Sequence, residues 1–280
     1  MGKNILPIVV TDSGAGGLFV LDKLARAFPR EKFIYFSDAG NMPYGNKTDE
    51  RILGFCRVRV DFAKRKNAKM IVVACNTMSA VGREVFAGCG IPVVFVLAAD
   101  ELSENRFAPK KLCGAHGKIG LPAVVFCTAA TGKSRAISRL SGQKEVVVYA
   151  ERDLAKEIEE HIFDLGAYDP RLAEGDRLSY KTVVLGCTHY ALVRDKFAKR
   201  FPGATVIDGT GGLENRVRRK LSEAVEIDGR ERKNRREGEN GGENRRGRGS
   251  WKRKSRVVFF GGGAKKMRRA FFALFTVDGS

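Results

Sequence analysis

Short runs of β-branched and aromatic residues alternate along this chain with longer amphipathic stretches, and this alternation restricts its fold more than any other feature. The runs are Ile8–Val10, Phe33–Phe36, Met70–Val73, Pro92–Val96, Ala123–Phe126, Val146–Tyr149, Thr182–Leu185, Thr205–Ile207 and Val257–Phe260. Apolar runs this short, without alternating polar residues, are typical of strands buried on both faces. Helical patterns such as Leu18–Phe28 and Ile52–Lys64 lie between them. The alternation predicts an α/β protein with mainly parallel sheets.

The two halves of the chain repeat the same succession of strand ends. In the first half, one strand leads into Asp12-Ser13, and another leads into Cys75-Asn76-Thr77, 62 residues after Ser13. In the second half, one strand ends at Cys127-Thr128, and another leads into Cys187-Thr188-His189, 59 residues after Thr128. Ligands of open α/β sheets bind beyond the carboxyl ends of the strands. We therefore predict two pseudo-symmetric domains that face each other, with the active site in the cleft between them and one cysteine on each side.

A basic segment, Gly229–Arg256, interrupts this regular pattern. It holds 12 Lys or Arg residues, 4 Asp or Glu residues, six glycines and a single apolar side chain, Trp251. Such a composition cannot bury enough apolar surface to fold alone. Because the strand pattern resumes at Val257, we interpret the segment as a flexible insertion. The first domain is then 1–98 together with 206–280, and the second is 99–205.

The sequence after the insertion predicts a turn followed by a helix. Gly261-Gly262-Gly263 is expected to form the turn. Met267, Phe271, Leu274 and Phe275 fall on one face of the helix that follows. We therefore expect this helix to pack against the first domain.

The net charge of +19 does not by itself indicate a nucleic-acid-binding protein, because +8 of it lies in the insertion. Binding of nucleic acid through the insertion, with Trp251 available for stacking, is kept as an alternative function. A solvated loop is the favoured interpretation. No apolar run approaches the ~18 residues of a membrane span. Six cysteines without a C-x-x-C pair, and only three histidines, favour reduced thiols in the cytoplasm and argue against a zinc site.

Two of the cysteines, Cys75 and Cys187, are candidates for chemistry. Each follows a strand and precedes residues that can hydrogen-bond, which is a setting that stabilises a thiolate. Free cysteines are more often inert small apolar residues of the core, and we accept that interpretation for the other four, which are Cys56, Cys89, Cys113 and Cys127. The equivalent placement of Cys75 and Cys187 in two similar halves favours a role as acid and base.

Two further loops are candidates for ligand binding. Asp12–Gly17 is a glycine-rich turn whose N–H groups can hold an anion, and Asp12 can accept a hydrogen bond from an ammonium group. Residues Cys127–Ser134 come close to a phosphate-binding loop, but cysteine stands where that loop requires glycine. Thr128 and Thr131 are therefore interpreted as hydrogen-bond donors to a carboxylate.

Four motifs, in this order, resemble one family. They are Asp12-Ser13-Gly14-x-Gly16-Gly17, Pro43-Tyr44-Gly45, Ala74-Cys75-Asn76-Thr77 and Gly186-Cys187-Thr188-His189-Tyr190. They resemble glutamate racemases, which belong to the aspartate/glutamate racemase superfamily. The resemblance implies a cytoplasmic enzyme that interconverts L- and D-glutamate without cofactor or metal and supplies D-glutamate for peptidoglycan synthesis. It is compatible with a homodimer. Racemisation of aspartate or of another amino acid by the same fold is kept as an alternative.

The resemblance also assigns roles to individual residues. Cys75 would act on the D-isomer and Cys187 on the L-isomer, each as base or acid on one face of Cα. Four polar residues would assist in catalysis, namely Asp12, Asp38, Glu159 and His189. The substrate-binding positions would be Asp12, Ser13, Tyr44, Gly45, Asn76, Thr77, Thr188 and His189, joined by Thr128 and Thr131.

Overall fold

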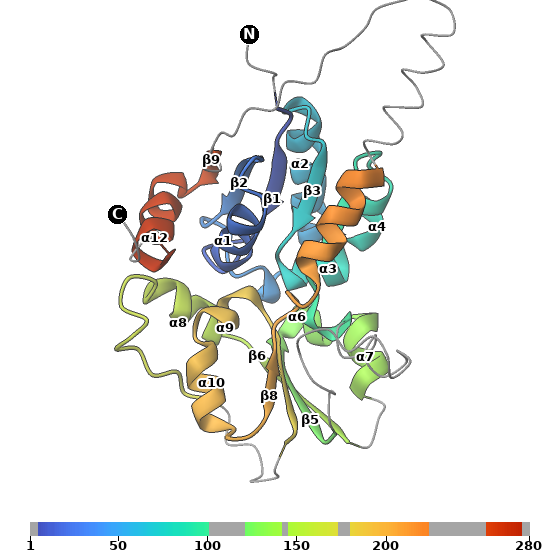
Figure 1. The fold of residues 1–280 in the computed structure, drawn as a ribbon. Coiled ribbons are helices and arrows are strands. Elements are labelled where there is room, and N and C mark those ends of the chain that lie inside the picture. The colour runs from blue at the N-terminus through green and yellow to red at the C-terminus, as the bar shows by residue number, and fades with distance from the viewer. Residues whose placement is uncertain (1–4, 101–120, 142–144, 173–179, 224–255, 276–280) are drawn as a thin grey trace, which may run out of the picture.

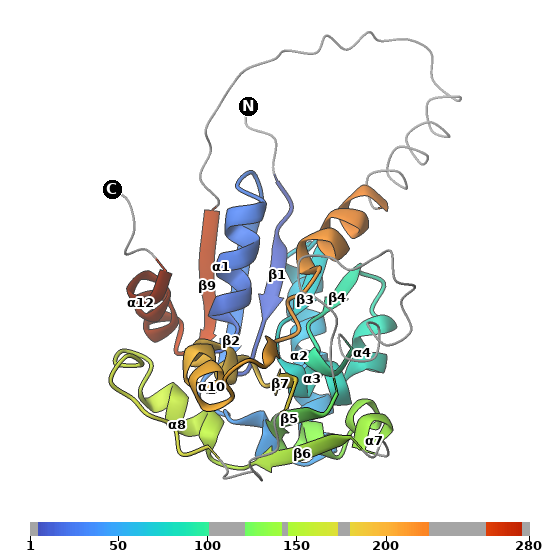
Figure 2. The same ribbon diagram turned by 60° about the horizontal axis from the view of Figure 1, so that its bottom comes forward.

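The computed structural model describes residues 5–100, 121–141, 145–172, 180–223 and 256–275, and its strands form two separate parallel sheets (Figures 1 and 2). The first sheet has the order β4 (Val93–Phe95), β3 (Met70–Val73), β1 (Ile8–Thr11), β2 (Lys32–Asp38), β9 (Arg256–Gly262). The second has the order β6 (Val146–Glu151), β5 (Ala123–Thr128), β7 (Thr182–Gly186), β8 (Thr205–Ile207). Every pairing is parallel. The α/β fold with mainly parallel sheets is confirmed, and each predicted run overlaps one of these strands.

Helices cover both faces of each sheet, which explains why the strands lack polar alternation. In β1, Ile8 and Val10 face the core that contains α1 and α12, whereas Val9 faces the core that contains α2. The helices are α1 (Leu18–Ala27), α2 (Asp49–Arg65), α3 (Asn76–Val81), α4 (Arg83–Ala87), α6 (Ala129–Gly132), α7 (Arg135–Ser141), α8 (Leu154–Glu160), α9 (Thr188–Leu192), α10 (Arg194–Arg200) and α12 (Ala264–Phe275), with a 3₁₀ turn η1 at Tyr44–Asn46. None of the helices in the described part of the chain is long and apolar enough to cross a membrane.

The predicted repetition of the two halves is present in the sheet topology. In the first sheet, β1 lies beside β3 with Thr11 opposite Val73. In the second, β5 lies beside β7 with Cys127 opposite Gly186. In both halves, the strand that leads to a small polar residue is thus the direct neighbour of the strand that leads to a cysteine.

Two details differ from the sequence-based expectations. β8 pairs with β7, so residues 205–207 extend the second sheet, and the boundary predicted at 206 falls inside a strand. Gly261 and Gly262 belong to β9 instead of forming a turn, because they continue the parallel register opposite Ser37 and Asp38. The remaining domain boundaries stay a prediction.

The last strand and helix close one side of the first sheet. β9 pairs with β2, and α12 buries Met267 and Phe271 in the core while Leu274 and Phe275 pack against it, which confirms the predicted apolar face. Residues 224–255, which hold all of the predicted insertion except its last residue, lie outside the described residues, as do His116 and Cys113.

Candidate active site

The carboxyl ends of β1 and β3 bring Asp12, Ser13 and Cys75 together. Cys75 precedes α3 as its N-cap residue, is 4% exposed, and directs its thiol toward Ser13 with a Sγ to Oγ distance of 3.9 Å. The Asp12 side chain is fully buried, and its Oδ1 atom accepts a hydrogen bond of 3.0 Å from the Gly14 N–H. The first predicted thiol therefore lies beside the glycine-rich loop, as the strand order requires.

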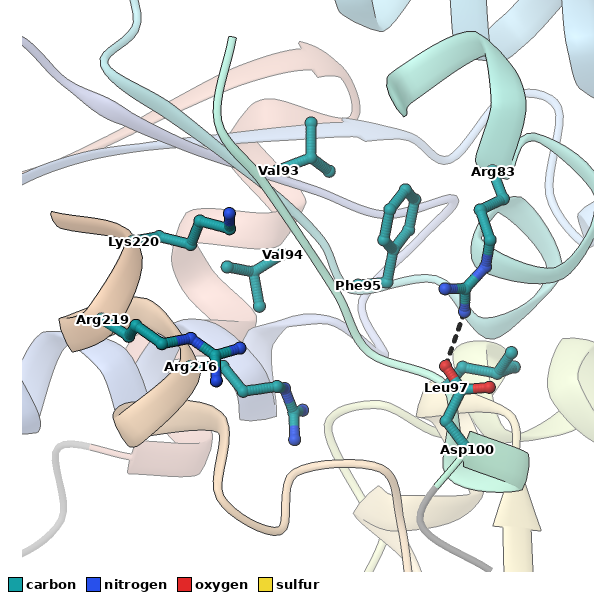
Figure 3. A pocket seen from close by; sticks show the side chains of 9 residues that line it. All are labelled: Arg83, Val93, Val94, Phe95, Leu97, Asp100, Arg216, Arg219 and Lys220. Atoms are coloured by element: carbon teal, nitrogen blue, oxygen red, sulfur yellow. Dashed lines mark hydrogen bonds and ion pairs between the residues drawn. The ribbon is translucent and has the colours of Figure 1, made fainter. Parts of the chain in front are cut away.

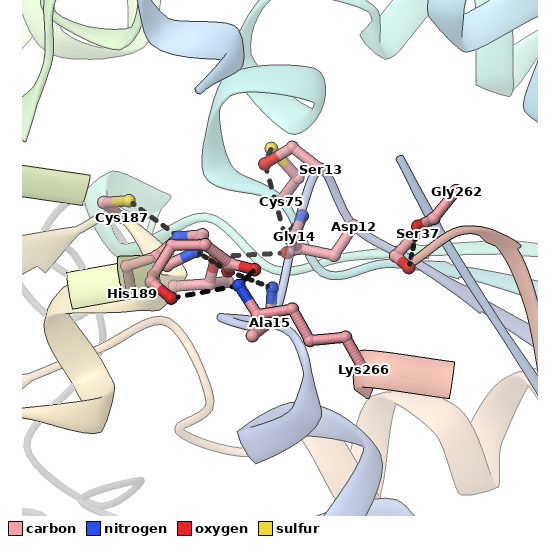
Figure 4. Close-up of polar contacts among 12 residues, drawn as sticks. Asp12, Ser13, Gly14, Ala15, Ser37, Cys75, Cys187, His189, Gly262 and Lys266 are labelled. Carbon is pink, nitrogen blue, oxygen red and sulfur yellow. Dashed lines mark hydrogen bonds and ion pairs between the residues drawn. The ribbon is translucent and has the colours of Figure 1, made fainter. Parts of the chain in front are cut away.

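The second sheet leads to the other thiol, Cys187, and the buried His189 side chain lies next to it (Figure 4). Cys187 is 7% exposed, and its Sγ lies 3.9 Å from Nδ1 of His189. The opposite ring nitrogen, Nε2, lies 2.9 Å from Oε2 of Glu159, which is contributed by α8. Thiol, imidazole and carboxylate thus form a continuous series of contacts.

Direct hydrogen bonds join the two halves at this place. The Thr188 hydroxyl donates to Oδ2 of Asp12 over 3.1 Å, and the Ala15 N–H donates to Oε2 of Glu159 over 2.7 Å. Cys75 and Cys187 therefore reach one region from two different sheets, as Figure 4 shows.

The environment of His189 and Glu159 makes both of them charged at neutral pH. Burial alone would raise the pKa of Glu159, but the hydrogen bond and charge of His189, the Ala15 N–H and the charge of Lys266 lower it to about 2. Burial alone would lower the pKa of His189, but hydrogen bonds to Cys187 and Glu159 raise it to about 10. A cation beside a thiol is the setting of a reactive cysteine.

The surroundings of Cys75, by contrast, favour the neutral, protonated thiol. Burial, followed by the nearby charge of Asp12, raises the pKa of its thiol well above the usual range, so that it carries a proton at neutral pH. The site thus holds a thiol suited to donate a proton on one side and a thiol next to an imidazolium on the other. This asymmetry suits an acid and a base acting in one reaction.

A cluster of hydroxyl groups lies where the two halves meet. The Oγ1 atoms of Thr77, Thr128 and Thr131 are 3.0 to 3.2 Å from one another. Thr77 comes from the first half and the other two from the second. Beside them, the side-chain oxygen Oδ1 of Asn76 accepts from the Ala98 N–H, while the buried Nδ2 of the same amide has no partner among the described residues. Unpaired buried donors of this kind fit a carboxylate ligand.

Tyr44 and Asp38 form a separate group. The Tyr44 hydroxyl donates to Oδ2 of Asp38 over 2.8 Å, and the Arg59 guanidinium lies 3.5 Å from the same carboxylate. The structure thus places Asp38 beside Tyr44 and Arg59, and its backbone N–H donates to the Ser13 carbonyl. Gly45 packs so closely on Thr128 that a Cβ there would overlap it.

Two residues of this region were not predicted from the sequence. Arg59 is 2% exposed and contacts the Tyr44 hydroxyl, and Lys266 pairs with Glu159. The sequence contains a signal for Arg59, because the helical spacing of Ile52, Cys56 and Arg59 puts this arginine on the buried face of α2. No local pattern indicates the role of Lys266, because its partner Glu159 is 107 residues away.

Sequence comparison identifies relatives over most of the chain, although no family model matches it. A glutamate racemase of Clostridium novyi is 30% identical over 223 residues, covering 77% of this chain and 83% of the relative. One from Syntrophus aciditrophicus is 35% identical over 206 residues, covering 69% and 73%. The chain belongs to the glutamate racemase family. The resemblance deduced from the four motifs is confirmed.

Solved glutamate racemases share the fold. The Thermus thermophilus enzyme, solved in complex with β-chloro-D-alanine, superposes with a TM-score of 0.67 at 26% identity, covering 96% of this chain and 92% of that one. The Campylobacter jejuni enzyme gives a TM-score of 0.66 at 23% identity and covers 98% of this chain and 100% of its own.

The tight contact at Gly16 makes a specific prediction for this racemase. A Cβ on Gly16 would lie 2.5 Å from Thr188 Oγ1 and 2.6 Å from the backbone nitrogen of His189. Gly16→Ala must therefore push the glycine-rich loop away from α9. We expect kcat/KM for glutamate to fall about 100-fold, because small displacements of catalytic groups have effects of that size. Gly54→Ala is the control, since nothing lies within 4 Å of its added Cβ. Equal activity of the two variants would contradict the packing.

A hollow of about 170 Å³ lies elsewhere, at the β4 edge of the first sheet (Figure 3). Its lining includes four cationic side chains, Arg83, Arg216, Arg219 and Lys220, and Arg83 pairs with Asp100. None of the predicted site residues lines it. In the described part of the chain, no three His, Cys, Asp or Glu side chains are arranged to hold a metal ion.

Proposed function

We propose that this protein racemises glutamate by a two-thiol mechanism that uses Cys187 and Cys75 and needs no cofactor. The observation that carries the proposal is the approach of two buried thiols from opposite sheets, Cys187 with its Sγ 3.9 Å from Nδ1 of His189 and Cys75 with its Sγ 3.9 Å from the Ser13 hydroxyl. Inversion at a carbon centre requires proton transfer on two opposite faces, and two facing half-sites supply this.

In the L-to-D direction, the Cys187 thiolate removes the Cα proton of L-glutamate. The electron pair of the broken C–H bond stays on Cα and is delocalised into the substrate carboxylate. The Cys75 thiol then donates its proton to the opposite face, and Cα is inverted. The products are D-glutamate, a Cys187 thiol and a Cys75 thiolate, from which the reverse reaction proceeds.

The remaining predicted residues are proposed to bind the substrate. Asp12 accepts from the substrate ammonium group, and the Ser13 hydroxyl lies next to the Cys75 thiol. The free Nδ2 of Asn76 and the hydroxyls of Thr77, Thr128 and Thr131 are donors for carboxylates. Tyr44, Gly45, Thr188 and His189 complete the surroundings, and Asp38 acts through Tyr44. A water-poor site strengthens each of these contacts.

The hydroxyl cluster can be tested by Thr128→Val, which keeps the shape of the side chain and removes its donor. We expect KM for L-glutamate to rise about tenfold, because one hydrogen bond to a charged group is lost. Thr205→Val, on β8, is the control for a β-branched replacement in the same half. An unchanged KM in Thr128→Val would show that this hydroxyl does not bind the substrate.

The function is tested by polarimetry or circular dichroism of purified protein with L-glutamate and, separately, D-glutamate, with pyridoxal phosphate excluded. We expect both isomers to reach the same racemic mixture. L-Aspartate and other L-amino acids, assayed in parallel, decide the substrate. Faster racemisation of aspartate would establish the alternative, and no racemisation of any amino acid would refute the proposal.

The cellular role follows from the chemistry. D-Glutamate is a building block of peptidoglycan, and we propose that this protein supplies it. Thiol chemistry requires reduced cysteines, and the five cysteines in the described residues are all free, which supports a reducing compartment such as the cytoplasm. A homodimer is proposed on the family resemblance, and its test is the mass measured by light scattering.

A further inference from the structure

Lys266 lies in the first turn of α12, which packs against the first sheet, and its side chain reaches α8 beside the second sheet. Its Nζ lies 3.1 Å from Oε1 of Glu159 and 3.2 Å from the Glu159 backbone carbonyl oxygen. Figure 4 shows the Lys266 side chain extending toward the Ala15 and His189 region. Glu159 belongs to α8, which packs against the second sheet. The C-terminal helix is thus tied directly to the acid–base pair behind Cys187.

The contacts of Glu159 are divided between its two oxygens. Oε2 accepts from the Ala15 N–H and faces Nε2 of His189, whereas Oε1 accepts from Lys266. A carboxylate held by donors on both oxygens cannot rotate about its terminal bond. Its orientation sets that of the His189 ring, and the ring sets the distance from Nδ1 to the Cys187 thiol.

We propose that Lys266 is a positioning residue for racemisation, which fixes the Glu159 carboxylate and thereby holds His189 against Cys187. The inference rests on the proposed function. It also assigns a role to the segment that follows the basic insertion. In this segment β9 pairs with β2 of the first sheet, and Lys266 forms an ion pair with Glu159 on α8.

The placement of Lys266 supports such a role. The side chain is 39% exposed, but the carboxylate that it contacts is only 5% exposed, so the ion pair has one partner in a nearly dry environment. Removing a donor from a buried carboxylate is costly because water cannot replace it fully. The helix itself is fixed independently, by Met267 and Phe271 in the core.

The test compares Lys266→Met with Lys265→Met, which removes the same charge from the exposed neighbour on the same helix turn. We expect Lys266→Met to lower kcat in both directions about tenfold with KM changed less than twofold, and Lys266→Arg to recover most of the loss. Lys265→Met should match the wild type. An equal loss in both lysine variants, or no loss in Lys266→Met, would overturn the proposal.

A double-mutant cycle separates positioning from general destabilisation. In a Glu159→Gln background, Lys266→Met should cost less than a further twofold in kcat, because Lys266 acts through Glu159. A further tenfold loss would show an independent structural role and refute the inference.

The four proteins of the cycle, namely the wild type, Lys266→Met, Glu159→Gln and the double variant, also give a readout that does not depend on activity. The urea midpoints of unfolding should be non-additive if Lys266 and Glu159 interact, and additive midpoints would overturn the pairing. If the wild type fails to racemise glutamate, the proposed function is wrong, and the midpoints still decide whether Lys266 holds Glu159.

Discussion

Cys75→Ser and Cys187→Ser are each expected to lower kcat for glutamate racemisation about 1,000-fold or more, in both directions. Serine keeps the size and hydrogen bonding of cysteine, but its hydroxyl is far too weak an acid to exchange the Cα proton at neutral pH. General acid–base catalysis by one group contributes about 10²- to 10⁴-fold, and inversion needs both groups. Circular dichroism with each isomer measures the loss.

Proton exchange in D₂O distinguishes the two thiols. In Cys75→Ser, the remaining Cys187 can remove and return the Cα proton on its own face, so L-glutamate should take up deuterium without forming D-glutamate. In Cys187→Ser, only D-glutamate should exchange. Mass spectrometry of the recovered substrate measures the uptake.

Cys89→Ser is the matched control for both variants. Cys89 is also buried, but it contacts the backbone of Ile91 rather than the site, so full activity is expected. Racemisation that survives in Cys75→Ser or Cys187→Ser would exclude the two-base mechanism. Exchange of both isomers in one variant would exclude the assignment of the thiols to separate faces.

The sequence was sufficient to predict the strands and the residues at their ends. Apolar runs such as Met70–Val73 are short, continuous and bounded by polar residues, so their burial and their ends are encoded locally. Parallel pairing then places the ends of neighbouring strands at one edge. Strand ends that share an edge of the sheet are therefore expected to lie close together, as Cys75 and Ser13 do.

Contacts between the halves could not be predicted in this way. The Ala15 N–H bond to Glu159 and the Lys266 pair with the same carboxylate join residues 144 and 107 positions apart, and neither depends on a local pattern. The position of Asp38 beside Arg59 likewise depends on how α2 packs on the first sheet. The family resemblance named Glu159 as an assisting residue, but only packing shows what it contacts.

The stability of the protein is expected to depend on pH through the buried pair of His189 and Glu159. The pKa of His189 is raised from 6.5 to about 10 by its hydrogen bonds to Cys187 and Glu159, which outweigh burial. The stabilisation from this raised pKa is complete below pH 6.5 and is lost as the pH rises through 10. The pKa of Glu159 is lowered from 4.5 to about 2, so its contribution is present above pH 4.5 and is lost as the pH falls toward 2.

The free energy of unfolding should therefore be greatest between pH 4.5 and 6.5 as far as this pair is concerned, and should decline on both sides. One proton changes it by at most about 1.4 kcal/mol per pH unit. Urea unfolding at pH 6, 8 and 9.5 measures the alkaline side for the wild type and for His189→Asn. Groups far from the site titrate equally in both proteins, so the difference between the two curves reports His189 together with the groups coupled to it, such as Glu159, and should shrink as the pH rises. Parallel curves would mean that His189 is not held as an imidazolium beside Cys187, and the environment proposed for the base would then be wrong.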